Sequence, residues 1–136
     1  MIRSLLALAL LATPAAATDV RVIDGDTIVV DGKHYRLAEI DTPETNKKPN
    51  CQREREIGTA ATKRLAELLT KGELTIVVVG DGGFGRDLAY VYAGEVDVGE
   101  TLMLEGLALK WTRGPKAKAA GMAIWCPPAS GPEPSR

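Results

Sequence analysis

Residues 20–44 of the chain read VRVIDGDTIVVDGKHYRLAEIDTPE. The β-branched and apolar residues of this stretch form three short runs, which predict strands at 20–23, 27–30 and 34–40. Between the second and third runs, Asp31 and Gly32 form a strong hairpin turn. Folding the hairpin brings its two ends together, so carboxylates from both ends gather near Arg36. Such a collection of oxygen ligands and one guanidinium suits a hard divalent cation and a phosphate.

The rest of the chain predicts a long helix, two further strands and a short second helix. In the long helix, residues 52–69, apolar side chains recur at spacings of four, four and three, at Ile57, Ala61, Leu65 and Leu68. The strands are predicted at 74–79 and 88–92, and the short helix at 98–105. This order predicts a mainly β, α+β fold, a five-stranded OB-type barrel whose long helix lies between strands three and four. A simple antiparallel α+β sheet is the alternative.

Several common kinds of functional site are excluded by the motifs. The glycines of residues 80–85 match a dinucleotide pattern, but a strand-like run follows them where that pattern requires a helix, so they are predicted to form a hairpin loop. Asp24 and Asp26 resemble the opening of an EF-hand, yet Tyr35 stands at the position of its final glutamate. His34 is the only histidine, so neither a zinc-protease motif nor a Ser-His-Asp triad is indicated.

The two ends of the chain differ in composition from the predicted domain, residues 18–126. Residues 1–17 combine a basic start, an apolar run and small residues before Thr18, which is the pattern of a signal peptide. We therefore expect an exported protein, periplasmic or extracellular, with no membrane contact after cleavage. A buried N-terminal helix is the alternative. Residues 127–136 are rich in Pro, Ser and Gly and are predicted to be disordered.

The two cysteines, Cys51 and Cys126, predict one disulfide in an exported protein. Closing a loop of that length stabilises the fold by roughly 4–5 kcal/mol in the chain-entropy model. Two free thiols are the alternative expected in a reducing compartment. The formal net charge is −1, so any binding of a polyanion has to be local or assisted by a metal ion.

Five motifs together resemble the staphylococcal nuclease (thermonuclease) family. In chain order they are VIDGDT at 22–27, YRL at 35–37, IDTPE at 40–44, GRDLAYVY at 85–92 and EGLA at 105–108. The similarity runs over most of the predicted domain. The IDTPE and GRDLAYVY motifs together are far more specific than any single short motif.

The resemblance implies a monomeric, calcium-dependent enzyme that cleaves phosphodiesters in DNA and RNA, and we expect it to prefer single-stranded substrates. The metal ligands it implies are Asp26, Asp41 and the backbone carbonyl of Thr42. The catalytic residues it implies are Glu44, which activates water, and Arg36 and Arg86, which bind the phosphate. Candidate substrate contacts are Tyr90, Lys110 and Trp111.

The chain also departs from the family pattern. Phe84 stands where the family carries a tyrosine, and the third family helix is predicted to be absent, with the disulfide fastening the C-terminus in its place. The competing hypothesis is a non-catalytic module of the same fold that binds nucleic acid or protein. The intact set of carboxylates and arginines favours the enzyme, because a binding module does not require it.

Overall fold

Five of the six strands of the main sheet lie side by side in one continuous order in the computed structural model, which describes residues 18–45 and 47–128. They are β1 (Val20–Asp24), β2 (Thr27–Val30), β3 (Lys33–Leu37), β5 (Leu74–Gly83) and β6 (Arg86–Ala93). Their spatial order is β1-β2-β3-β6-β5, and β3 and β6 run parallel while the other neighbours are antiparallel. With the long helix between β3 and β5, this topology confirms the predicted OB-type fold.

Three short strands complete the β-structure beyond the five that were expected. Strand β7 (Val96–Asp97) pairs with β6, and β4 (Ile40–Asp41) pairs with β8 (Leu109–Lys110) in a separate two-stranded ladder. The predicted third strand, 34–40, therefore ends early at Leu37. Glu39 adopts a positive φ of 62°, which turns the chain out of β3 and into β4.

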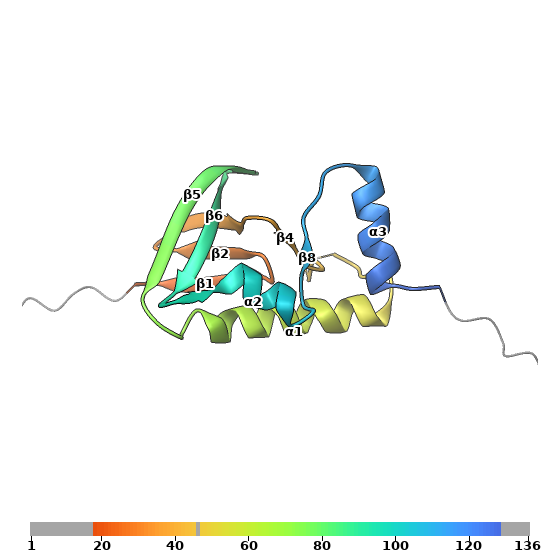
Figure 1. Ribbon diagram of the computed structural model, residues 1–136, viewed down its shortest axis with the longest axis horizontal. Coiled ribbons are helices and arrows are strands. Elements are labelled where there is room, and N and C mark those ends of the chain that lie inside the picture. Colours follow the sequence, from red (N-terminus) through yellow and green to blue (C-terminus); the bar gives the residue numbers. More distant parts are fainter. Residues whose placement is uncertain (1–17, 46, 129–136) are drawn as a thin grey trace, which may run out of the picture.

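Helix α1 (Gln52–Leu68) lies along one side of the sheet and covers the core (Figure 1). Its buried residues are Glu54, Gly58, Ala61, Leu65 and Leu68. Ile57 was expected on this face and is only half-buried. Helix α2 (Val98–Leu104) packs beside α1, and Asp97 caps it by accepting a hydrogen bond from the Glu100 N–H. Ile28, Leu37 and Val91 of the sheet meet Leu65 and Leu102 of the helices in the core.

Two glycines allow α1 to approach the segments that carry the predicted site. A Cβ atom at Gly58 would lie 3.0 Å from the carbonyl oxygen of Pro43. A Cβ atom at Gly25 would lie 2.6 Å from Thr42 Oγ1 and 2.8 Å from the Cβ atom of Ala61. At these two glycines, α1 and the β1–β2 turn therefore pack so closely against the segment after β4 that no side chain fits between them.

The hairpin formed by β5 and β6 is longer than predicted. Strand β5 continues to Gly83 through two irregularities of register, so Gly80 and Gly82 lie in a strand and not in a loop. Only Gly83, Phe84 and Gly85 take positive φ values at the tip. The strand β6 that follows confirms that the glycine motif does not begin a dinucleotide-binding helix.

The prediction that the third helix is absent is wrong. Helix α3 (Pro115–Trp125) stands apart from the sheet, above the N-terminal end of α1 (Figure 1). Its alanines and lysines favour helix, and proline suits its first turn, although no regular apolar stripe marks it. The predicted disulfide between Cys51 and Cys126 is present, so it does not replace the helix but ties its C-terminal end to the residue that caps α1.

Two of the predicted segments lie largely or wholly outside the described residues. They are the signal peptide, residues 1–17, and all but the first two residues of the C-terminal tail, residues 127–136. Among the helices of the described residues, none combines the length and the apolar character that a membrane crossing requires.

Candidate active site

Asp26, Arg36 and Asp41 meet at the end of the β2–β3 hairpin. In the hairpin register Thr27 pairs with Arg36, which places the arginine next to Asp26. Arg36 Nη1 lies 2.6 Å from Asp26 Oδ2, and Nη2 lies 3.5 Å from Asp41 Oδ1. The side chain of Arg36 is only 14% exposed and that of Asp26 only 7%, whereas Asp41 is half-exposed. The three residues predicted to bind metal and phosphate are thus brought together by β2, β3 and β4.

The carboxylates of this group carry more negative charge than one guanidinium neutralises. Burial raises the pKa of Asp26 to about 7, against the opposing effect of Arg36 and with a further increase from Asp24. Burial also raises the pKa of Asp41, and the nearby carboxylate of Glu44 adds to the increase while Arg36 opposes it. A raised pKa means that the ionised form of the carboxylate is disfavoured. A cation bound beside Asp26 and Asp41 would favour their ionised forms.

Thr42 closes the group from the side of α1. Its backbone N–H donates a hydrogen bond to Asp26 Oδ2 over 3.2 Å. Its hydroxyl oxygen is buried and has no hydrogen-bond partner among the described residues. Thr42 is therefore fixed against Asp26 and leaves one buried oxygen unsatisfied.

The residues present fit a hard cation. Two carboxylates, from Asp26 and Asp41, and the oxygens of Thr42 are the donor types that calcium prefers, and calcium commonly completes its shell with water. Within residues 18–45 and 47–128, no three side chains of His, Cys, Asp or Glu are grouped to hold a metal ion. Backbone oxygen and water must therefore supply the remaining ligands.

Arg86 reaches this group from the tip of the distant β5–β6 hairpin. Its Nε and Nη2 atoms donate to the carbonyl oxygens of Gly83 and Gly82, each over 3.0 Å. Its Nη1 atom donates to Thr27 Oγ1 over 3.2 Å, and the Thr27 hydroxyl in turn donates to Asp26 Oδ1. The second guanidinium is therefore held in one orientation, one hydroxyl away from Asp26.

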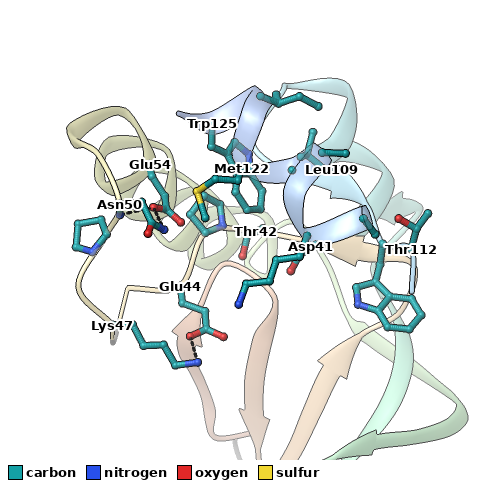
Figure 2. Close-up of a pocket in the computed structure, with 18 of the residues that line it drawn as sticks. Asp41, Thr42, Glu44, Lys47, Asn50, Glu54, Leu109, Thr112, Met122 and Trp125 are labelled. Atoms are coloured by element: carbon teal, nitrogen blue, oxygen red, sulfur yellow. Dashed lines mark hydrogen bonds and ion pairs between the residues drawn. The ribbon is translucent and has the colours of Figure 1, made fainter. Parts of the chain in front are cut away.

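Glu44 lies on the exposed side of the group. Its side chain is 52% exposed and forms an ion pair of 3.0 Å with Lys47. It lines an open cavity of about 770 Å³, whose other lining residues come from the segment after β4, from β8 and the loop that follows it, and from α3 (Figure 2). Asp41 and Thr42 also line this cavity, and the half-exposed side chain of Asp41 is open to a water molecule or a phosphate, whereas Thr42 is buried.

The three candidate substrate contacts are placed differently. Lys110 and Trp111 line the cavity, and the guanidinium of Arg113 lies 5.9 Å from the centre of the Trp111 ring. Tyr90 does not line it. It lies on the outer face of β6, where partial burial and the carboxylate of Glu39 raise the pKa of its hydroxyl.

Sequence reasoning did not assign a role to four residues that contribute to the site. Thr27 connects Arg86 with Asp26, and the carbonyl groups of Gly82 and Gly83 orient Arg86. Asp24 accepts a hydrogen bond from the Asp26 N–H. Asp24 and Thr27 stand within the DGDT motif, which was the available signal, whereas backbone carbonyls leave no signal in a sequence.

Comparisons with known proteins agree with this arrangement. The family model described as "Staphylococcal nuclease homologue" matches residues 34–125, more than half of the chain. That range includes Arg36, Asp41, Glu44 and Arg86, and Asp26 lies before it.

Three curated relatives are similar over 65% of the chain. Endonuclease YncB of Bacillus subtilis (strain 168) is 45% identical over 97 residues, which cover 44% of its own length. The SPbeta prophage-derived endonuclease YokF of the same organism is 44% identical over 99 residues, covering 31% of its length. The thermonuclease of Staphylococcus hyicus is 42% identical over 95 residues, covering 55% of its length. The chain thus spans about half or less of the length of these relatives.

Proposed function

Because this chain belongs to the family of staphylococcal nuclease homologues, we propose that it is an exported, calcium-dependent nuclease that hydrolyses phosphodiester bonds in DNA and RNA. The observation that carries the proposal is the meeting of Asp26, Arg36 and Asp41, with Arg86 oriented toward the same group. Of these residues, Asp41 borders an open cavity. A structural domain has no need for a guanidinium shared by two carboxylates whose pKa values are raised.

Asp26, Asp41 and the backbone carbonyl of Thr42 are the residues that would hold the calcium ion. When bound, the ion supplies positive charge beside the phosphate and the charge that develops on it. Thr42 is fixed for this role by the hydrogen bond from its N–H to Asp26.

Arg36 and Arg86 stabilise the phosphoryl group as it becomes more negative. The transition state of phosphodiester hydrolysis concentrates charge on the equatorial oxygens, and a planar guanidinium matches two such oxygens at once. Arg86 is held in place by three hydrogen bonds before substrate arrives. Positioned donors of this kind require little reorganisation during the reaction.

Glu44 acts as the general base. Its exposed carboxylate takes a proton from the water molecule that attacks phosphorus, while the bond from phosphorus to the leaving oxygen breaks. Lys47 forms an ion pair with this carboxylate, and both residues line the cavity.

The substrate lies along the cavity that starts at Asp41 and Glu44. Lys110 supplies positive charge to the sugar–phosphate backbone, and the exposed face of Trp111 offers a surface for stacking. We expect a monomer that favours single-stranded nucleic acid. The disulfide supports export, since such bonds persist in oxidising compartments.

Cleavage of labelled oligonucleotides tests the proposal. The purified protein is incubated with single-stranded DNA and with RNA, in calcium or in chelator, and a Glu44→Gln, Arg86→Ala double variant serves as control. Cutting that needs calcium and is lost in the double variant supports the proposal. A wild-type protein that binds these oligonucleotides without cutting them, over a range of pH and calcium concentration, would show it to be a binding module.

A further inference from the structure

Helix α3 is attached to the rest of the domain at its C-terminal end. Its last residue, Trp125, is buried, whereas the other side chains described in this helix are exposed or half-buried. The next residue, Cys126, forms the disulfide with Cys51, whose Sγ atom lies 3.5 Å from the carbonyl oxygen of Trp125. Within residues 18–45 and 47–128, no ion pair involves α3. Trp125 and the disulfide are therefore the main restraints on the position of this helix.

The other end of the disulfide lies where the loop that carries Glu44 leads into α1. Cys51 is the N-cap of α1, and its Sγ atom accepts a hydrogen bond from the Glu54 N–H over 3.4 Å. The neighbouring Asn50 donates to Glu54 Oε2 from its backbone over 2.6 Å and from its side chain over 2.9 Å. The loop and α3 line the same cavity, and Figure 2 shows Trp125 across it from Glu44. The bond thus fixes α3 relative to the loop of the proposed general base.

We propose that the disulfide between Cys51 and Cys126 is a redox switch, which makes the nuclease fully active only when the bond is formed. The inference rests on the proposed nuclease function and adds its regulation. With the bond formed, the loop and α3 keep one relative position. When the bond is reduced, the apolar packing of Trp125 is the main restraint left on α3, so the helix can move away from the loop. A misplacement of about 1 Å at a site can lower the rate by roughly 10²-fold.

The surroundings of the two sulfur atoms differ. A thiolate at Cys51 would be stabilised by the N-terminal N–H groups of α1, because the sulfur occupies the N-cap position. Cys126 Sγ lies 3.9 Å from Glu54 Oε2, and a carboxylate disfavours a second negative charge beside it. Both cysteines are half-buried, so a reductant reaches them from solvent. Cys51 is therefore the sulfur that leaves, and Cys126 is the sulfur that is attacked.

The reductant is a dithiol, either a small molecule or a protein. One of its thiols loses a proton and attacks the Cys126 sulfur, the S–S bond breaks, and Cys51 leaves as a thiolate that takes up a proton. The second thiol then loses its proton and attacks the mixed disulfide at the reductant's own sulfur, which releases Cys126 as a thiolate that takes up a proton. Two electrons and two protons pass from the dithiol, which becomes a disulfide. The reverse reaction, with a disulfide as the oxidant, forms the bond.

This chemistry links activity to the compartment. A reducing cytosol keeps both thiols reduced, and an oxidising compartment forms the bond. The proposed export would therefore switch the nuclease on after it has left the nucleic acids of its own cell.

Cleavage rates in the two redox states are the first test. The oxidised wild type, the dithiothreitol-reduced wild type and a Cys51→Ser, Cys126→Ser double variant cut a labelled single-stranded oligonucleotide in calcium. Serine also caps a helix, so the variant loses the bond and keeps a cap. We expect kcat/KM to fall by roughly 10²-fold on reduction and in the variant, and to recover in the wild type on reoxidation. Equal rates in the two redox states, or an equal loss when dithiothreitol is added to the variant, would overturn the switch.

Limited trypsin digestion reads the position of α3 without substrate. Lys116 and Lys118 are exposed cleavage sites on α3, whereas Lys63 and Arg64 are comparison sites within α1. Mass spectrometry of the reduced wild type and the double variant should show faster cutting at the two sites on α3 and little change at those on α1. Equal acceleration at all four sites would show that the bond stabilises the whole fold and would overturn the switch.

The two experiments separate the switch from the nuclease function. If the wild type cuts no substrate in either redox state, the nuclease function fails, and the digestion still decides whether the bond controls α3. If the oxidised and reduced proteins cut substrate equally, the nuclease function stands and the switch fails.

Single variants test the order of attack. Cys126→Ser leaves the Cys51 thiol, and Cys51→Ser leaves the Cys126 thiol. At neutral pH, an aromatic disulfide reagent should react severalfold faster with the Cys51 thiol, because its thiolate is the favoured one. Faster reaction of the Cys126 thiol would overturn the assignment of Cys51 as the sulfur that leaves.

Discussion

Arg36 Nη1 lies 2.6 Å from Asp26 Oδ2, within a region where both side chains are almost fully buried. Neutralisation of Asp26 therefore depends on a residue that is also predicted to bind the substrate phosphate. We therefore expect Arg36 to have two separable roles, one in stability and one in catalysis.

Replacing Arg36 by alanine should lower turnover by roughly 10²–10³-fold, the usual effect of removing a positioned donor to the charge of a transition state. It should also lower the melting temperature, because buried Asp26 loses its partner. Arg36→Lys should recover much of the stability and little of the turnover, since an ammonium group cannot make the two-pronged contact. Thermal melts and single-turnover rates measure the two effects.

Arg86→Ala is the contrasting variant. Arg86 is held by two carbonyl groups and a hydroxyl, and not by a buried carboxylate. Its removal should lower turnover by a similar roughly 10²–10³-fold with a smaller change in melting temperature. A larger destabilisation by Arg86→Ala than by Arg36→Ala would contradict this division of roles.

The sequence predicted the hairpin and its site residues because both depend on local chemistry. Asp31 and Gly32 take the positive φ values that their turn requires, and the period-two register then places Arg36 beside Asp26. Arg86 was a candidate for a second guanidinium from the sequence, and the family resemblance gave it a role, but local chemistry did not predict its approach to the hairpin. It depends on contacts between residues 59 positions apart and on the carbonyl groups of two glycines.

Two differences from the prediction, the presence of α3 and the position of the buried face of α1, have causes that are not local to the sequence. Helix α3 depends on the helix propensity of alanine and lysine and is anchored by Trp125 and the disulfide. Its sequence therefore lacks the regular spacing of apolar residues by which α1 was predicted. In α1, Gly58 is buried because Pro43 packs on it, which leaves Ile57 half-buried. Tertiary packing of this kind is not encoded in the spacing of apolar residues.

Glu44→Gln should lower turnover by about 10²–10⁴-fold, the range for loss of a general base. The melting temperature should stay unchanged, because the side chain is exposed and its partner Lys47 is more exposed still. Lys47→Ala is the control, since it removes the same ion pair and leaves the base in place. If Lys47→Ala lowers turnover as much as Glu44→Gln does, the loss comes from the broken ion pair, and the assignment of Glu44 as general base is wrong.

Calcium should raise the melting temperature of the wild-type protein, since a ligand that binds only the folded state stabilises it by about 2.7 kcal/mol at a hundredfold excess over Kd. Magnesium should do so poorly, because it requires a tighter octahedral shell. Asp41→Asn should remove most of the calcium effect. Calorimetry that detects no calcium binding, even with a nucleotide analogue present, would refute the metal assignment.

Gly25→Ala should destabilise the fold by about 1–3 kcal/mol, as overpacking of a close contact does. The added methyl group would collide with Thr42 Oγ1 and with Ala61, so the loop that carries Glu44 must move away from α1. Gly80→Ala is the matched control, because its nearest neighbour, a methyl carbon of Leu88, is 4.0 Å from the added atom. Chemical denaturation of both variants gives the comparison, and equal losses would argue against the close packing at Gly25.

The titration of Asp26 makes a prediction about stability in chelator. Its pKa is raised from 3.8 to about 7 in the folded protein, chiefly by burial. Between these values the folded state binds a proton that the unfolded state has released, so the contribution of Asp26 to stability declines as the pH rises. Asp26→Asn imitates the protonated form and does not titrate. The variant should match the wild type near pH 4 and become more stable than it by a few kcal/mol as the pH approaches 8. Urea unfolding of both proteins across this range measures the difference, and a difference that does not grow with pH would show that the buried carboxylate stays ionised beside Arg36.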